Sequence, residues 1–174
     1  MKNKKHIILG VHDGHDSSVC LIINGIIVYA SQEERFTKIK NDYGFPQKAI
    51  ENCLHYTKIK KSEISEVALG TNYLNPVLTK LKRNANFSIK NWIEEQELFW
   101  KPKILKKKKV SYWNVFKNHK NFKHDKYYDY NNIIKSYMSK NDMKEFQRRR
   151  VKKLSGYLNI DENKISIIDH EKCH

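Results

Sequence analysis

Three short apolar segments near the start of the sequence constrain the fold of this chain more than any other feature. Residues 7–11, 19–23 and 26–30 are each about the length of a strand and rich in β-branched side chains. Asn24 and Gly25 separate the second segment from the third, and a two-residue turn of this composition is typical of a β-hairpin, because both positions take a positive φ. The pattern therefore predicts three consecutive strands, each antiparallel to the next.

The connection between the first two segments, HDGHDSS at residues 12–18, is richer in functional groups than a turn requires. A glycine and one aspartate suffice for the turn, yet this segment holds two histidines and two aspartates. Gly14 allows the backbone to approach a ligand closely, and His15 can accept or donate a proton near neutral pH. The segment therefore indicates a functional site. These residues alone leave a second interpretation open, which is a polar hairpin whose side chains bond to their own backbone.

The elements that follow predict an α/β fold. Residues 46–57 carry apolar side chains at helical spacing, and residues 67–70 form an apolar run that ends in glycine. The order β-β-β-α-β over residues 1–71 is the opening of an RNase-H-like half, as in actin-like ATPase domains. Residues 156–174 return to this α/β core with a further strand at 164–168 and the start of a helix.

The net charge of +15 comes entirely from residues 72–155, where 22 lysines and arginines accompany 7 acidic residues. The segment also contains all three tryptophans and predicts a basic, mostly helical insertion. Basic clusters at 106–109 and 148–150 lie among aromatic residues, a composition used for phosphate contacts and base stacking. The alternative function is therefore a small basic nucleic-acid-binding protein using residues 72–155, although a solvated surface is the commoner origin of such clusters and nucleic acid is not the expected partner.

Two helices are expected inside this insertion. Residues 86–100 have helical periodicity, with Ser88 as a candidate N-cap, and Pro102 is expected to end the helix. Residues 142–158 form the second helix, with an apolar stripe on one face and the three arginines of 148–150 on another.

The two ends of the chain bear on its location and completeness. No run of about 18 apolar residues exists, and the first apolar run is too short for a signal peptide, so a cytoplasmic protein is expected. His170 and His174 are four residues apart, which places both imidazoles on one helix face and suits a shared metal, but a third ligand is missing. A buried strand with no helix to cover it is an unusual end for a domain, so we expect the chain to be the N-terminal part of a longer protein.

Three motifs together resemble a known family. GVHDGHDSS, NGIIVYASQEERFTKIKNDYGFP and IIDHEKCH, in this order, resemble the N-terminal domain of the carbamoyltransferases of the nodulation-factor and antibiotic-biosynthesis type. The resemblance covers residues 6–71 and 150–174, with a weaker likeness at 82–103. It implies an actin-like N-terminal domain and a separate C-terminal activating domain. It also implies that carbamoyl phosphate and ATP give a carbamoyl-adenylate, whose carbamoyl group passes to a hydroxyl of a small-molecule or sugar acceptor.

The resemblance also assigns roles to five residues. His15 matches the catalytic histidine, expected to act as general base on the acceptor hydroxyl. Asp13 matches an acidic residue on the substrate side, and Lys40 matches a lysine expected near the carbamoyl-adenylate. His170 and His174 match two histidines that hold iron or another divalent ion beside the nucleotide phosphates.

Several expectations depend on what this chain lacks or changes. Glu171 stands where the family usually has a second histidine, which leaves the two presumed metal ligands intact but removes a neighbouring imidazole. Without the activating domain and the third metal ligand, residues 1–174 alone are expected to be inactive. A remnant that keeps the fold without the chemistry is a third interpretation, against which the intact motif residues count.

Overall fold

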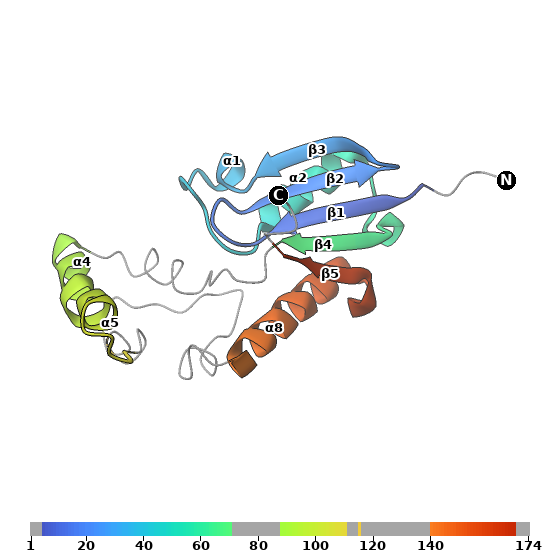
Figure 1. The fold of residues 1–174 in the computed structure, drawn as a ribbon. Helices are drawn as coiled ribbons and strands as arrows, with labels where there is room; N and C mark the ends of the chain where they lie inside the picture. Colours follow the sequence, from blue (N-terminus) through green and yellow to red (C-terminus); the bar gives the residue numbers. More distant parts are fainter. Residues whose placement is uncertain (1–4, 71–87, 111–114, 116–139, 170–174) are drawn as a thin grey trace. The chain divides into compact units, whose positions relative to one another are not determined.

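The computed structural model describes residues 5–70, 88–110, 115 and 140–169 (Figure 1). The chain divides into two compact units, which are described separately below. The first unit comprises Met1–Pro76 and Gln147–His174, and the second comprises Val77–Phe146. The domain boundaries inferred from the sequence, after residues 71 and 155, stay predictions.

The first unit is built on a five-stranded mixed sheet in the order β3-β2-β1-β4-β5 (Figure 1). Strands β1, β2 and β3 form an antiparallel meander, whereas β4 and β5 run parallel to β1. This topology confirms the predicted α/β class and is consistent with an RNase-H-like or actin-like half. The strands are β1 (Ile7–His12), β2 (Ser18–Ile23), β3 (Ile26–Gln32), β4 (Glu66–Gly70) and β5 (Ile165–Ile168).

The β2–β3 hairpin turns where the sequence predicts it. Asn24 and Gly25 have φ values of 50° and 85°, as a two-residue turn of the primed type requires. The Asn24 side-chain oxygen accepts a hydrogen bond from the backbone N–H of His6 at 2.9 Å, and the Asn24 N–H donates to the His6 carbonyl at 2.9 Å. The turn is thereby tied to the start of β1.

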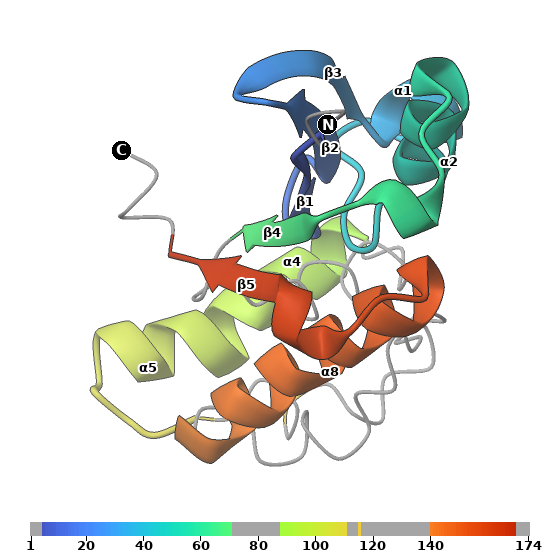
Figure 2. The same ribbon diagram turned by 90° about the vertical axis from the view of Figure 1, so that its right-hand side faces the viewer.

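Two longer helices accompany the sheet. Helix α2 (Gln47–Thr57) and the C-terminal part of α8 (Lys140–Leu158) lie on the same side of it (Figure 2). The rings of Phe45 and Tyr157 meet edge to face at 5.1 Å, which joins the two helical segments directly. A short helix α1 (Glu34–Thr37) occupies part of the polar run after β3, for which no helix was predicted. Single 3-10 turns, η1 (Lys61–Glu63) and η3 (Glu162–Lys164), precede β4 and β5.

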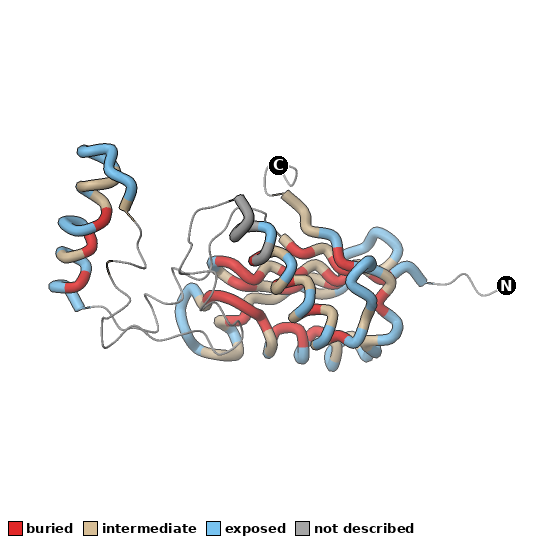
Figure 3. Tube along the Cα trace, turned by 90° about the horizontal axis from the view of Figure 1, so that it is seen from below, coloured by how far each residue is buried: buried red, intermediate tan, exposed pale blue. Residues whose placement is uncertain are grey.

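The core of the first unit lies between the sheet and these two helices. Leu9, Leu21 and Leu69 point to this side and are at most 1% exposed, as are Ile50 of α2 and Leu158 of α8. Buried and half-buried positions alternate along β1, β2 and β4, as the period of two of a strand requires (Figure 3). Each fully buried leucine or isoleucine contributes about 1.5–3 kcal/mol relative to an exposed one.

The opposite face of the sheet is made of small side chains. Gly10, Cys20 and Ala68 occupy neighbouring positions on β1, β2 and β4, and Gly10 faces Cys20 directly in the register. A Cβ added to Gly10 would lie only 2.5 Å from the Cys20 Sγ. Glycine is therefore needed at this position to leave room for the thiol.

Replacing Gly10 with alanine is expected to destabilise the protein by about 1–3 kcal/mol, because the new methyl group overpacks against the Cys20 thiol. Urea unfolding measures the loss, and the same change in a Cys20→Ala background should cost clearly less. Gly156→Ala serves as the control, because a Cβ there meets nothing within 4 Å and the site is helical. That variant should gain about 0.5–1 kcal/mol. An equal loss of stability on Gly10→Ala with and without the Cys20 thiol would contradict the packing argument.

The second unit contains a helical run that begins at the predicted cap. Ser88 accepts a hydrogen bond from the backbone N–H of Asn91 and begins α4 (Ile89–Glu95). A π-helical turn (Gln96–Trp100) and helix α5 (Lys101–Ile104) continue the run. The expectation that Pro102 ends the helix is wrong, because Pro102 lies in the first turn of α5 and the helical run continues past it to Ile104. No helix in the described part of the chain is long and apolar enough to cross a membrane.

Candidate functional site

The HDGHDSS segment forms a loop at the carboxyl end of β1. Because β4 and β5 run parallel to β1, their carboxyl ends meet at the same edge of the sheet. This edge therefore gathers the β1–β2 loop, Gly70 at the end of β4, and Asp169 directly after β5. Ligands of open α/β sheets bind beyond the carboxyl ends of the strands, so the loop lies where a site is expected.

Asp13, the first residue of the loop after β1, is buried and paired with an arginine. Its side chain is 2% exposed and that of Arg150 from α8 is 1% exposed. The Arg150 Nε donates to Oδ2 of Asp13 at 2.8 Å, while Nη2 donates both to Oδ1 of Asp13 and, at 2.8 Å, to the carbonyl of Gly70. One guanidinium group thus holds the ends of β1 and β4 together.

Sequence reasoning missed Arg150. It grouped residues 148–150 as a basic face apart from the apolar stripe of this helix, and for Arg150 that expectation is wrong. Phe146, Arg150, Leu154 and Leu158 follow one another at intervals of four, and all four are buried. The signal in the sequence is this spacing, which places one of the three arginines on the buried face of the helix.

His15 lies at the tip of the loop with its side chain half exposed. Its Nδ1 is 2.8 Å from Oδ2 of Asp16, and its ring packs edge to face against Tyr43 at 5.8 Å. A carboxylate accepts hydrogen bonds, so Nδ1 carries a proton and Nε2 is the basic nitrogen of a neutral ring. The loop thereby presents an oriented imidazole to solvent.

Backbone hydrogen bonds fix the loop on both flanks. The N–H of Ser17 donates to the carbonyl of Asp42 at 3.0 Å, and the N–H of Gly44 donates to the carbonyl of Gly14 at 3.3 Å. Nε2 of His12 donates to the carbonyl of His15 at 2.9 Å. The segment after β3 therefore returns to this loop and holds it in place.

Lys40 belongs to the segment that braces the loop, two residues before Asp42. Its side chain is 84% exposed, and its Nζ lies 3.4 Å from Oε1 of Glu34. The backbone N–H of Asn41 donates to the other carboxylate oxygen of Glu34, and this bond lowers the pKa of that carboxyl. The ammonium group of Lys40 therefore stands at the surface near the base of the loop.

Glu33 caps helix α2 from a distance of fifteen residues. Its carboxylate accepts the backbone N–H of Lys48 at 3.1 Å and that of Ala49 at 2.7 Å, and the residue is 5% exposed. Burial raises the pKa of the Glu33 carboxyl, although the two backbone hydrogen bonds oppose this shift. No local sequence pattern indicates this role, because the capping residue is remote in sequence from the helix it caps.

The raised pKa of Glu33 predicts a pH effect on stability. In strong acid the Glu33 carboxyl is protonated in both the folded and the unfolded chain. As the pH rises, the carboxyl ionises first in the unfolded chain, because its pKa is raised in the folded chain and ionisation there costs more free energy. The contribution of Glu33 to stability therefore falls toward neutral pH. Urea unfolding of Glu33→Gln should show the variant gaining stability relative to wild type as the pH is raised from acid, where the Glu33 carboxyl is protonated, to neutral. The exposed Glu162→Gln is the control, and equal pH slopes for wild type and Glu33→Gln would contradict the effect.

A cavity of about 290 Å³ adjoins the loop on the face of small side chains. A Cβ at Gly70 would lie 3.3 Å from Nδ1 of His12, so the absence of a side chain there leaves space beside the loop. The cavity is lined by Gly10, Val11, His12, Ser18, Val19, Cys20, Ala68, Gly70 and Ile168.

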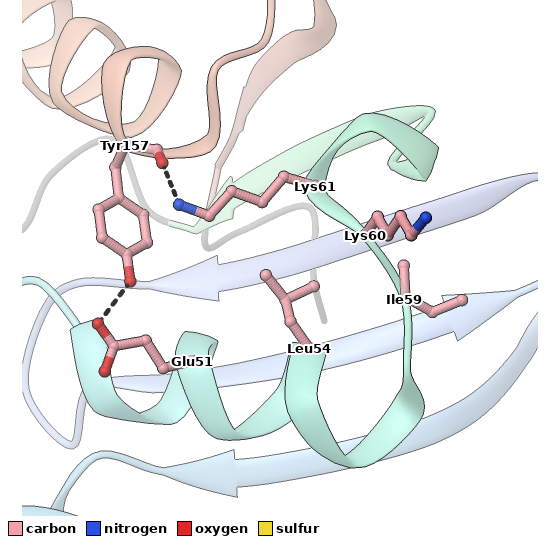
Figure 4. A pocket seen from close by; sticks show the side chains of 6 residues that line it. All are labelled: Glu51, Leu54, Ile59, Lys60, Lys61 and Tyr157. Atoms are coloured by element: carbon pink, nitrogen blue, oxygen red, sulfur yellow. Dashed lines mark hydrogen bonds between the residues drawn. The ribbon is translucent and has the colours of Figure 1, made fainter.

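A second hollow, of about 450 Å³, lies between α2, η1 and α8 (Figure 4). Its polar groups bond to one another: the Tyr157 hydroxyl donates to Glu51 at 3.0 Å, and Lys61 donates to the Tyr157 carbonyl at 2.6 Å. These bonds join the elements around the hollow, whereas the cavity at the loop adjoins the imidazole of His12.

The predicted metal ligands His170 and His174 lie outside the described residues. Within the described part of the chain, no group of three or more histidine, cysteine, aspartate or glutamate side chains could hold a metal ion. Asp169 directly precedes His170 at the carboxyl edge of the sheet. The metal site stays a prediction.

Comparisons with known proteins connect this site to a family. The chain is 45% identical over 64 residues to an uncharacterized protein of Methanocaldococcus jannaschii and 40% identical over 65 residues to one of Synechocystis sp.. It is 33% identical over 54 residues to the nodulation protein NolNO of Sinorhizobium fredii. These matches cover 37%, 37% and 31% of this chain but only 12%, 10% and 8% of the respective relatives. The matched part is therefore about a tenth of the length of these relatives.

The pattern that defines the carbamoyltransferase N-terminus family matches residues 7–174. The match includes the β1–β2 loop, the bracing segment around Asp42, and β5 with the residues that follow it. Extending over nearly the whole sequence, it shows that this chain belongs to the carbamoyltransferase N-terminus family.

Proposed function

We propose that this chain is the N-terminal part of an O-carbamoyltransferase. The enzyme would use carbamoyl phosphate and ATP to form a carbamoyl-adenylate, and would transfer the carbamoyl group to a hydroxyl of a small-molecule or sugar acceptor. Family membership supports carbamoyl transfer as the reaction class. The observation that carries the proposal is the half-exposed His15, whose Nδ1 is held by Asp16 at the carboxyl edge of the sheet.

His15 would act as the general base of the transfer step. Nε2 would take the proton of the acceptor hydroxyl while the hydroxyl oxygen attacks the carbamoyl carbon. The bond between that carbon and the adenylate oxygen would break, and AMP would leave. Asp16 would stabilise the imidazolium that forms and keep the proton on Nδ1 in the resting ring.

Lys40 and Asp13 would contribute in different ways. The exposed ammonium of Lys40, which lies 3.4 Å from Oε1 of Glu34, would act on the adenylate as a point charge. The Asp13 carboxylate is buried under Arg150, so we propose that it acts on the substrate side indirectly, by fixing the loop that carries His15.

The remaining parts of the enzyme would come from residues outside the described structure. His170 and His174 supply two imidazole ligands, a donor type that suits iron and other divalent transition metals, and a third ligand would come from elsewhere. A bound divalent ion would compensate the charge of the nucleotide phosphates. The activating domain that makes the carbamoyl-adenylate would belong to the further length seen in the relatives.

The test is turnover by the full-length protein. With carbamoyl phosphate, ATP and a panel of sugar and polyol acceptors, we expect AMP release that requires carbamoyl phosphate and rises with the correct acceptor. Mass spectrometry should then find a carbamate ester on the acceptor. Residues 1–174 alone should release no AMP under the same conditions. AMP release independent of carbamoyl phosphate, or turnover by residues 1–174 alone, would contradict the proposal.

A further inference from the structure

We propose that Arg150 is a positioning residue that clamps the loop of residues 12–17 to the end of β4 and so sets the position of His15. The clamp itself follows from the contacts of the first unit, whereas its effect on turnover rests on the proposed carbamoyl transfer. Arg150 lies 137 residues from Asp13 in sequence, so the contact ties α8 to the loop through side chains alone.

The first branch of the clamp is the bidentate pair with Asp13. Nε and Nη2 of Arg150 donate to the two oxygens of the carboxylate, and both side chains are at most 2% exposed. A forked pair of this kind fixes direction as well as distance, because the guanidinium and the carboxylate are both planar. The start of the loop therefore has one orientation relative to α8.

The second branch runs through the end of β4 to His15. Nη2 of Arg150 also donates to the Gly70 carbonyl at 2.8 Å. The end of β4 lies beside the His12 ring, since a Cβ added to Gly70 would stand 3.3 Å from its Nδ1, and Nε2 of His12 donates to the His15 carbonyl at 2.9 Å. The position of His15 is thus fixed from both sides, through Asp13 on the chain before it and through the His12 ring at its own carbonyl.

A lysine could not replace this arrangement. Its ammonium is a point charge on a flexible stem and cannot bond both carboxylate oxygens and the Gly70 carbonyl in the planar geometry of a fork. It would still neutralise the buried Asp13 charge, so the sheet should remain folded. Arg150→Lys therefore separates loop position from general stability.

The experiment uses the full-length protein with Arg150→Lys and, as the control, Lys152→Arg at an exposed position of the same helix. Amide hydrogen exchange is read at Ser17 and Gly44, whose N–H groups close the loop, and at Leu9 and Leu69 in the sheet core. For Arg150→Lys we expect exchange about tenfold faster at the two loop amides, with little change at the two core amides. Lys152→Arg should match wild type at all four positions.

Turnover provides the second reading. If the protein transfers carbamoyl groups, Arg150→Lys should lower kcat by up to about a hundredfold, since a small misplacement of a catalytic group costs that much, and should leave the KM for carbamoyl phosphate near its wild-type value. A loss confined to KM would overturn the positioning role. If the wild-type protein shows no transfer, the proposed function fails, and the exchange measurement still decides whether the clamp exists.

Three results with Arg150→Lys would overturn the clamp. One is unchanged exchange at Ser17 and Gly44 in Arg150→Lys. Another is equal acceleration at the loop and core amides, which would indicate a general loss of stability. The last is failure of Arg150→Lys to fold, because the proposal holds that folding needs only a positive charge beside Asp13 and not the forked pair of hydrogen bonds.

Discussion

Replacing His15 with alanine is expected to lower the rate of carbamoyl transfer by about 10²–10⁴-fold, the usual contribution of a general base. The acceptor hydroxyl would then have to lose its proton to water, which is a weaker and unpositioned base. Because the side chain is half exposed, its loss should leave the free energy of unfolding close to that of wild type. Single-turnover transfer by the full-length protein measures the rate, and urea unfolding checks the fold.

His55→Ala is the matched control for this experiment. His55 is an exposed histidine on α2, away from the loop. The His55→Ala variant should retain wild-type turnover and stability. Full transfer activity in His15→Ala would exclude His15 as the base, even if the protein proved to be a carbamoyltransferase.

Replacing Arg150 with methionine is expected to destabilise the protein by about 3–5 kcal/mol, the usual effect of removing one partner of a buried ion pair. The Asp13 carboxylate would be left buried without its partner guanidinium, and the Gly70 carbonyl would lose a donor. Urea unfolding measures the loss. Lys152→Met, at an exposed position of the same helix, should change the free energy of unfolding by less than about 0.5 kcal/mol.

A double-mutant cycle separates the pair from the burial of either group. Asp13→Asn removes the charge, so Arg150→Met should cost clearly less in that background than in wild type. The expected coupling between the two sites is about 2–3 kcal/mol, which is the upper part of the range for contacting residues. Additive costs in the double variant would show that the two side chains do not depend on each other.

Much of the local structure was determined by the sequence. Strands β1, β2 and β3 follow from β-branched segments of strand length, and Asn24 with Gly25 sets the hairpin because few other residues accept a positive φ. The position of His15 at a loop beyond β1 also followed from the sequence, since polar residues interrupt two apolar runs there. Such features depend on residues that are close together in the sequence, so local sequence patterns predict them.

The partners of the charged residues were decided by the tertiary structure alone. Glu33 caps a helix that begins at Gln47, and Arg150 binds a carboxylate 137 residues away. Among three consecutive arginines, the sequence does not say which one has a buried acid opposite, because that depends on how α8 lies against the end of the sheet. Removing both charges from water costs free energy, which the mutual attraction and the hydrogen bonds of the pair offset only where the fold brings the two groups together. From the sequence alone, Arg150 is expected apart from the apolar face of its helix, and only the packed structure shows it buried there with Asp13 and Gly70 as its partners.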